Sequence, residues 1–264
     1  MSYRITPPRK KKGNSSQTLR YWGLFALAVG IAARTIIQNR ILGVNVSTGK
    51  EVYDLLADSK NMALATAAIV AQLLHACAIP LFCFLLVEGV KHTKSFRNYF
   101  LRVAGIALLS EIPFNLVMSG KVLDLNSRNP VVGLVLAMVV IFLLKQYAAK
   151  SFKGIVIPIL VIALSVLWVE MLRIEDGAAT VLVVSTLWLT RKKLVWQVFI
   201  GAIVMCLCMI LNPLYMLAPL VFLLINSYNE EKGESIRWID LLAYPALLLG
   251  LWLLGLLGQL AFQI

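Results

Sequence analysis

Long apolar runs separated by short polar or basic stretches make up most of the chain. A helix needs about 20 mostly apolar residues to cross a bilayer, within a range of about 17–25. The runs therefore predict membrane-crossing helices over 21–38, 62–90, 99–118, 130–148, 154–171, 176–190, 194–211, 213–227 and 239–260. The runs 176–190 and 213–227 are short for a full crossing. Asn212-Pro213 divides the sequence from 194 to 227 and makes either a tight hairpin or a kink. The pattern predicts an all-α, polytopic transmembrane helical bundle with about nine spans, eight being the alternative.

Composition agrees with a chain that is embedded in a membrane. Of its 264 residues, 60% are hydrophobic and 14% are charged, whereas an ordinary soluble domain is about 45–50% apolar and about 25% charged. The net charge is +12, but the basic residues lie in short loops between apolar runs instead of forming one face interleaved with aromatic residues. This distribution argues against nucleic acid as a partner and for contact with the lipid bilayer.

The basic loops also predict an orientation. Clusters of Lys and Arg occupy residues 1–20, 91–102, 145–153 and 191–193. With nine spans all four fall on one side, which the positive-inside rule makes cytoplasmic. We therefore expect a basic cytoplasmic tail over residues 1–20 and a transmembrane domain over 21–264 in the plasma (cytoplasmic) membrane, with the N-terminus inside.

One block of sequence combines charge with apolar residues in a distinctive order. It runs "PLFCFLLVEGVKHTKSFRNYFLRVAGIALLSEIPFN" over residues 80–115. Proline, Val-Glu-Gly, His-Thr, a basic loop with tyrosine, Leu-Arg and Ser-Glu-Ile-Pro-Phe-Asn follow one another as in the TraX family of integral membrane proteins, which the block resembles. Weaker matches follow in "NPVVGLVLAM", "EDGAATVLVV", "INSYNEEKGE" and "LLAYPALLL". The resemblance covers about residues 70–250.

The resemblance implies a chemistry. The family takes its name from a plasmid transfer protein linked to N-terminal acetylation of pilin, and it looks related to membrane acyltransferases. It thus implies an acyl-CoA-dependent acetyltransferase with acetyl-CoA as the donor substrate, no metal, and an acceptor that is a protein amine, a glycan hydroxyl or a lipid.

The chain also departs from the family pattern. Family members usually carry an Asp-His pair in the first helix, where this chain has Ala33 and Arg34. The final Tyr-Pro-x-His becomes Tyr244-Pro245-Ala246-Leu247, and His75 replaces a Gly-Arg pair before Pro80. These departures favour an alternative, a catalytically inactive subunit or scaffold of a membrane assembly. A small-anion transporter that uses the same intramembrane charges is a third hypothesis.

Three ionisable residues within apolar sequence are the catalytic candidates: His75, Glu88 and Glu111. Charge inside a span is costly and by default suggests function, and histidine titrates in the range that suits a general base. The structural alternatives are packing for His75, an interfacial ion pair with Lys91 or Arg102 for Glu88, and a helix–helix hydrogen bond for Glu111. We expect Glu111 to point into the bundle, because an ionised carboxylate that faces lipid is too costly.

The block that carries the resemblance also contains the candidates for binding the donor. His92, Arg97 and Arg102 are expected to contact the phosphates of coenzyme A. Basic side chains, arginine above all, donate strong charge-assisted hydrogen bonds to phosphate oxygens. Topology and contact with anionic lipids is the alternative explanation. Two further polar sets, one at 126–129 and one at 175–176, are expected to line an outward-facing acceptor site or to suit helix dipoles.

Overall fold

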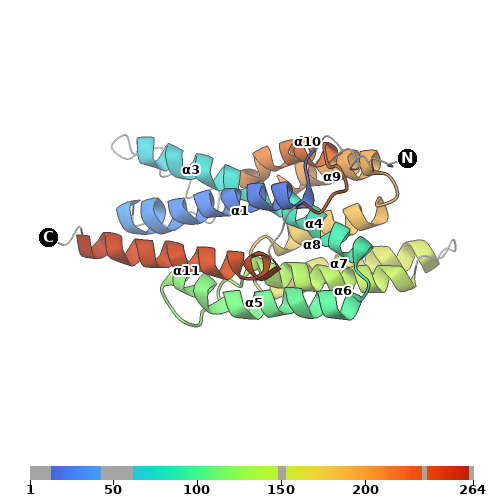
Figure 1. Cartoon of the computed structure of the whole chain (residues 1–264), viewed down its shortest axis with the longest axis horizontal. Coiled ribbons are helices and arrows are strands. Elements are labelled where there is room, and N and C mark those ends of the chain that lie inside the picture. Colours follow the sequence, from blue (N-terminus) through green and yellow to red (C-terminus); the bar gives the residue numbers. More distant parts are fainter. Residues whose placement is uncertain (1–12, 43–61, 148–152, 234–236, 262–264) are drawn as a thin grey trace, which may run out of the picture.

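The computed structural model describes residues 13–42, 62–147, 153–233 and 237–261, and these residues form helices and connecting turns without a named strand (Figure 1). The elements are α1 (Ser16–Ala32), η1 (Ala33–Leu42), α3 (Met62–Ala76), α4 (Ala78–His92), α5 (Phe96–Ser119), α6 (Pro130–Gln146), α7 (Lys153–Met171), α8 (Gly177–Leu189), α9 (Leu194–Cys208), η2 (Pro213–Leu220), α10 (Val221–Asn226) and α11 (Arg237–Ala261). The all-α helical bundle predicted from the apolar runs is confirmed.

Four helices in the described ranges are long and apolar enough to cross a membrane. They cover Ser16–Gln38, Met62–His92, Phe96–Ser119 and Gly154–Met171. Five shorter apolar helices cover Pro130–Gln146, Gly177–Leu189, Leu194–Cys208, Pro213–Asn226 and Leu241–Leu257. Each coincides with one of the nine predicted ranges, and together they indicate a membrane protein.

Two local features were not settled by the apolar pattern. The predicted helix 62–90 is interrupted at Cys77, between α3 and α4. At Asn212-Pro213 the chain turns, because the Asn212 side chain accepts a hydrogen bond from the Leu214 amide at 3.0 Å and starts η2. Since α9 packs against both η2 and α10, this junction is a hairpin and not a kink.

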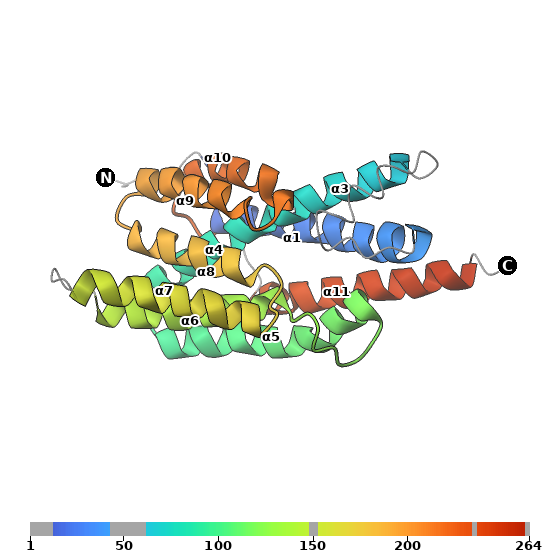
Figure 2. The same cartoon turned by 180° about the vertical axis from the view of Figure 1, so that it is seen from behind.

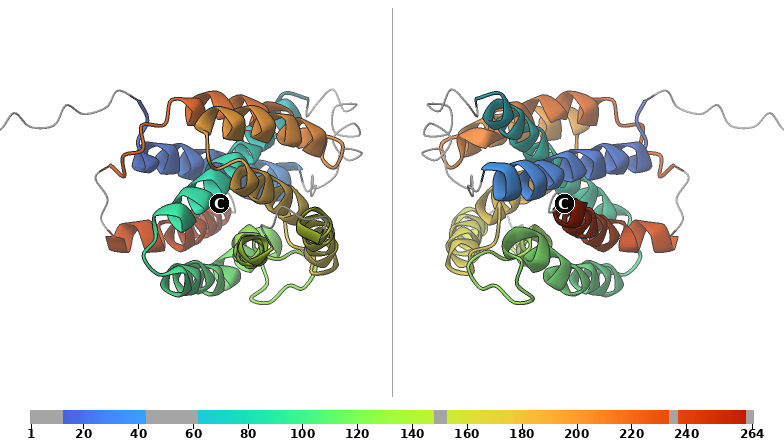
Figure 3. Two further views of the ribbon diagram at one scale, coloured as in Figure 1. Left: turned by 90° about the vertical axis from the view of Figure 1, so that its right-hand side faces the viewer. Right: turned by 90° about the vertical axis from the view of Figure 1, so that its left-hand side faces the viewer.

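The bundle is elongated, and its core is built around α8 (Figures 1 and 2). Ten of the thirteen residues of α8 are buried, because α4, α6, α7 and α9 surround it. A second apolar cluster joins α1, α5 and α11 through residues such as Leu27, Phe114 and Leu248. The first turns of α11 lie across the direction of its later turns (Figure 3), which the internal Pro245 explains.

The turn between α4 and α5 contains only Thr93–Ser95. The Ser95 side chain caps α5 by accepting from the Asn98 amide at 3.3 Å. After the turn, α5 packs mainly on α11 and α6 and contacts α4 little. Residues 80–115 thus form the predicted helix–turn–helix, but its two helices diverge.

The turns rich in basic residues gather at one end of the long axis. The α4–α5 turn, the end of α6, the start of α7 and the α8–α9 turn all point that way (Figures 1 and 2). The side of a membrane that this end faces stays a prediction.

Candidate functional site

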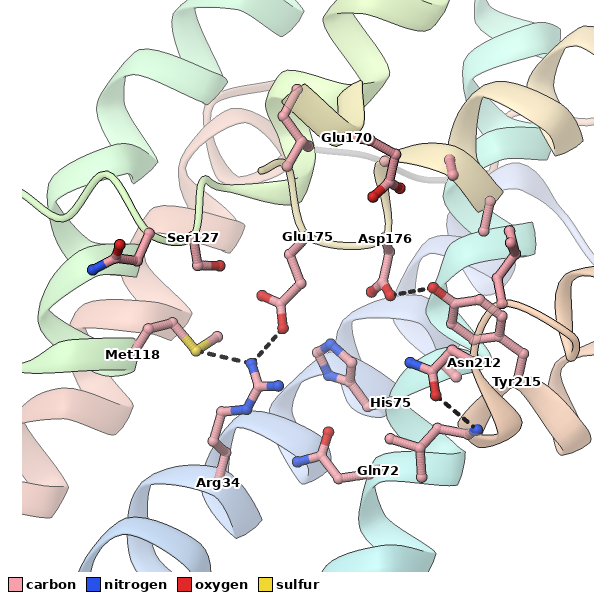
Figure 4. Close-up of a pocket in the computed structure, with 18 of the residues that line it drawn as sticks. Arg34, Gln72, His75, Met118, Ser127, Glu170, Glu175, Asp176, Asn212 and Tyr215 are labelled. Atoms are coloured by element: carbon pink, nitrogen blue, oxygen red, sulfur yellow. Dashed lines mark hydrogen bonds and ion pairs between the residues drawn. The ribbon is translucent and has the colours of Figure 1, made fainter. Parts of the chain in front are cut away.

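A polar pocket of about 520 Å³ lies where helix ends and turns from most of the chain meet (Figure 4). It is lined by Arg34 of η1, by Gln72 and His75 of α3, by the α7–α8 and α9–η2 turns, and by Tyr215 of η2. The lining includes the carboxylates of Asp124, Glu170, Glu175 and Asp176. Ionisable groups inside a membrane bundle normally face such a cavity and not lipid.

Backbone geometry fixes the acidic side of the pocket. A short bridge joins the α7–α8 turn to the segment before α6: the Arg128 amide donates to Arg173 O at 2.9 Å, and the Glu175 amide donates to Arg128 O at 3.0 Å. Asp176 then has a φ of 55°, a left-handed conformation that costs a non-glycine residue about 1 kcal/mol or more. This strained turn aims two consecutive carboxylates into one pocket.

Glu175 forms an ion pair with Arg34 across the pocket (Figure 4). The two side chains are only 17% and 13% exposed. Arg34 Nη1 also lies 3.0 Å from Met118 Sδ. Arg34 Nε and Glu175 Oε2 are buried and have no hydrogen-bond partner among the described residues, so the pair leaves polar atoms that a ligand or water could satisfy.

Asp176 accepts a hydrogen bond from the Tyr215 hydroxyl at 2.5 Å (Figure 4). Asp176 lies in the loop between α7 and α8. Burial, reinforced by the neighbouring Glu175 carboxylate, raises its pKa to about 6, while the Tyr215 hydrogen bond opposes this shift. The two adjacent acids are therefore in different environments, one paired with a guanidinium and one with a phenol.

His75 lies beside both acids and against the backbone of α1 (Figure 4). A Cβ atom on Gly30 would come within 2.2 Å of His75 Cβ, so only glycine allows the ring to pack there. One turn earlier, Gln72 Nε2 donates to Gly30 O at 3.1 Å. His75 Nδ1 is buried and has no hydrogen-bond partner within the described ranges, which leaves a ring nitrogen free to accept or donate a proton.

The pocket has an excess of acid. Four carboxylates face one guanidinium and one imidazole. Because net negative charge in a low-dielectric cavity attracts cations, the arrangement suits a ligand with a positively charged group.

The sequence-predicted site residues fall into three places. His75 lines the pocket. Glu88 is buried at the other end of the bundle, where it bonds Lys91 Nζ and His92 Nε2 at 3.1 Å each, the interfacial pairing considered as its structural alternative. Arg97 and Arg102 are exposed on α5.

Glu111 lies further along α5 than Arg97 and Arg102. Its Oε2 atom is buried without a hydrogen-bond partner in the part of the chain that the structure describes. Along α5, Glu111 lies between the buried face that includes Ser110 and Phe114 and the outer face, where Leu108 and Ile112 are 78% and 49% exposed. The expectation that Glu111 points into the bundle is confirmed, while its role is not tested by this placement.

The two polar sets predicted to line an acceptor site, 126–129 and 175–176, do not all reach the pocket. Asn126, Glu175 and Asp176 line the pocket. Asn129 is instead a buried link between helices: it donates to Ser110 Oγ at 2.5 Å and accepts from the Val131 amide at 2.9 Å and from the Tyr244 hydroxyl at 3.3 Å. It holds α5, α6 and α11 together behind the pocket.

Sequence reasoning missed Arg34, Asn212 and Tyr215 as pocket residues. Arg34 carried a usable signal, because an arginine near the end of an apolar run is expensive unless it is paired. Tyr215 and Asn212 carried none, since a tyrosine and an asparagine beside a proline are ordinary at a helix start.

The fold and the pocket define a class: a helical membrane protein with a charged, partly buried cavity. Within it, the family model described as TraX protein matches residues 54–255. The chain therefore belongs to the TraX family, over a longer stretch than the 70–250 expected from motifs. No curated protein and no solved structure matches the chain.

Proposed function

We propose that this protein is a membrane-embedded acyltransferase that moves an acetyl group from acetyl-CoA to an amine-bearing acceptor held in the central pocket. The observation that carries the proposal is the buried, unpartnered Nδ1 of His75 beside Glu175 and Asp176, as found for the described residues. Acyl transfer needs a base at the attacking atom, and histidine is the side chain that most often serves.

The acidic lining supports an amine in preference to a hydroxyl or a lipid tail. An amine is an ammonium ion at neutral pH, so Glu175 and Asp176 would attract and orient it. His75 would take the proton that the ammonium must lose. The free amine nitrogen would then form a bond to the thioester carbonyl carbon as the carbon–sulfur bond breaks. The nitrogen would lose a second proton as it becomes an amide, the departing sulfur would take that proton, and coenzyme A would leave as the thiol.

The donor would enter from the basic end, where His92, Arg97 and Arg102 lie. The proposed orientation puts that end and the N-terminus in the cytoplasm, with the protein in the plasma membrane. The thioester would then have to reach along α8, whose 13 residues span about 18 Å from the basic end to the pocket. Glu88 would organise this end through its contacts to Lys91 and His92.

The test is transfer of labelled acetyl groups by the purified protein in nanodiscs. A peptide with a free N-terminal amine is compared with the same peptide blocked by a formyl group and with a hydroxyl-bearing oligosaccharide. His75→Gln should reduce transfer to the free amine by about 10²–10⁴-fold, the usual contribution of a general base. Ser165→Ala is the matched control, because Ser165 bonds only within α7, to Val161 O, away from the pocket.

Full activity of the His75→Gln variant would contradict the role of His75, and transfer to the blocked peptide or the oligosaccharide alone would contradict the amine. A second candidate function is a non-catalytic subunit of a membrane assembly. It is favoured by Arg34, which stands where the family Asp-His pair is expected and whose ion pair to Glu175 occupies the pocket. No transfer by the unmodified protein to any of these acceptors, together with a tightly co-purifying membrane protein, would support that alternative.

A further inference from the structure

A second charged cluster lies at the basic end of the bundle, outside the central pocket. Its centre is the buried ring of Trp188 at the end of α8. Lys145 Nζ lies 5.0 Å from the centroid of that ring, and the Arg191 guanidinium carbon lies 3.8 Å from it. Lys145 Nζ also lies 5.0 Å from the ring centroid of Phe96, the first residue of α5.

The cluster brings two cations together without a balancing acid. Within the described ranges, neither Lys145 nor Arg191 makes an ion pair to a carboxylate. The aromatic faces attract each cation, but they do not cancel the repulsion between the two. An anion placed between them would relieve that repulsion and gain charge-assisted hydrogen bonds.

The Arg191 side chain is fixed in position by two contacts to Trp188. The Arg191 guanidinium is anchored by its own hydrogen bond from Nη1 to Trp188 O at 2.7 Å, so it is held in place before any ligand binds. The stack on the ring and this bond leave its other donors available.

A helix start supplies further positive potential at the same turn. α9 begins just after Lys193, whose side chain makes no capping hydrogen bond to it. The lysine side chain has no acceptor atom and cannot cap these amides. Lys193 O accepts from the Trp196 and Gln197 amides at 3.1 and 3.2 Å, which leaves the amides before them at the helix start. Uncapped amides and the helix dipole both favour an anion next to Arg191.

We propose that Lys145 and Arg191, held on Trp188, form a binding site for a phosphate group at the basic end of the protein. This assignment differs from the sequence-based expectation, which favoured Arg97 and Arg102. Arg97, Arg102 and Lys145 are all exposed and Arg191 is half-buried. The difference is that aromatic rings and a main-chain oxygen position Lys145 and Arg191. The phosphate has two sources in this setting: an anionic lipid headgroup, or a soluble donor such as acetyl-CoA.

The experiment measures binding and not transfer, so it stands or fails independently of the proposed enzyme activity. In the soluble arm, acetyl-CoA is titrated by calorimetry into protein in phosphatidylcholine nanodiscs. In the lipid arm, native mass spectrometry measures how much phosphatidylglycerol the detergent-solubilised protein retains in competition with phosphatidylcholine. Each arm compares the unmodified protein with Lys145→Gln/Arg191→Gln, with Arg97→Gln/Arg102→Gln, and with Lys192→Gln/Lys193→Gln.

The Lys145→Gln/Arg191→Gln variant should lose at least about tenfold in affinity in one arm, because two charge-assisted contacts disappear. The arm that responds identifies the source of the phosphate. The Lys192→Gln/Lys193→Gln control removes the same charge from the same turn and should change affinity by less than about threefold, since exposed charges are screened by salt. Lys145→Arg keeps both charges and leaves the Arg191 contacts to Trp188 in place, so it should retain most of the binding, which separates a lost charge from a misfolded protein.

Three results would overturn the proposal. The first is unchanged affinity of the Lys145→Gln/Arg191→Gln variant in both arms, or no binding of either probe by the unmodified protein. The second is an equal loss in the Lys192→Gln/Lys193→Gln control, which would mean surface charge only. The third is a loss confined to Arg97→Gln/Arg102→Gln, which would return the site to the start of α5.

Discussion

Removing one partner of the Arg34–Glu175 ion pair should destabilise the protein strongly. Both side chains are largely buried, at 13% and 17% exposed. Replacing Arg34 by methionine keeps the volume of the side chain but leaves the Glu175 carboxylate buried without its cation. A buried pair broken in this way typically costs about 3–5 kcal/mol. For a protein of this size, where 1 kcal/mol shifts the Tm by about 2–4 °C, the expected fall in Tm is about 6–20 °C.

The assay is thermal unfolding in detergent, followed by tryptophan fluorescence, for Arg34→Met, Glu175→Met and the double variant. The double variant leaves neither partner of the pair buried without the other, so it should recover most of the lost stability, with a coupling energy of at least about 2 kcal/mol. Lys192→Met is the control, because Lys192 is exposed and makes no ion pair to a carboxylate within the described ranges; it should cost about 0.5 kcal/mol or less. Additive effects of the two single variants, or a Tm change for Arg34→Met no larger than the control, would refute the reasoning.

Three further predictions concern the pocket and the topology. The pKa of Asp176 is raised to about 6 in the folded protein, from about 3.9 in the unfolded chain. Because the folded state binds the proton more tightly, the free energy of unfolding should fall as the pH rises from about 4 to about 6. Asp176→Asn should flatten this pH dependence when the Tm is measured across the same range. Gly30→Ala would put a Cβ atom 2.2 Å from His75 Cβ, so overpacking should cost about 1–3 kcal/mol in unfolding experiments, and a Tm equal to that of the unmodified protein would contradict the contact. A cysteine introduced at Lys94, in the α4–α5 turn, should react with an impermeant maleimide only from the cytoplasmic side; labelling from outside would reverse the proposed orientation.

Length and hydropathy were enough to find the helices. Each apolar run appears as a helix because a bilayer leaves backbone amides and carbonyls no other partners, and this rule acts on each segment separately. The inward direction of Glu111 followed from the same local argument, since a carboxylate facing lipid costs too much. The break at Cys77 and the divergence of α5 from α4 did not follow, because both depend on the helices packed around them.

The pocket shows where prediction from sequence stops. His75 and Glu175 were each notable in the sequence as polar residues in or beside apolar runs, and Arg34 stood out only as a departure from a family pattern. Nothing local indicated that these three residues and Tyr215 share one cavity, because their separation in space depends on how α1, α3, α8 and η2 pack. Likewise, the basic loops were readable as a topology signal, but the stacking of Lys145 and Arg191 on one tryptophan ring is a contact between α6 and the α8–α9 turn. The sequence alone determined which segments enter the membrane, because burial of apolar surface and backbone hydrogen bonding act on each segment separately. Only the tertiary structure decided which charges meet, because that depends on how the helices cross, which no single segment encodes.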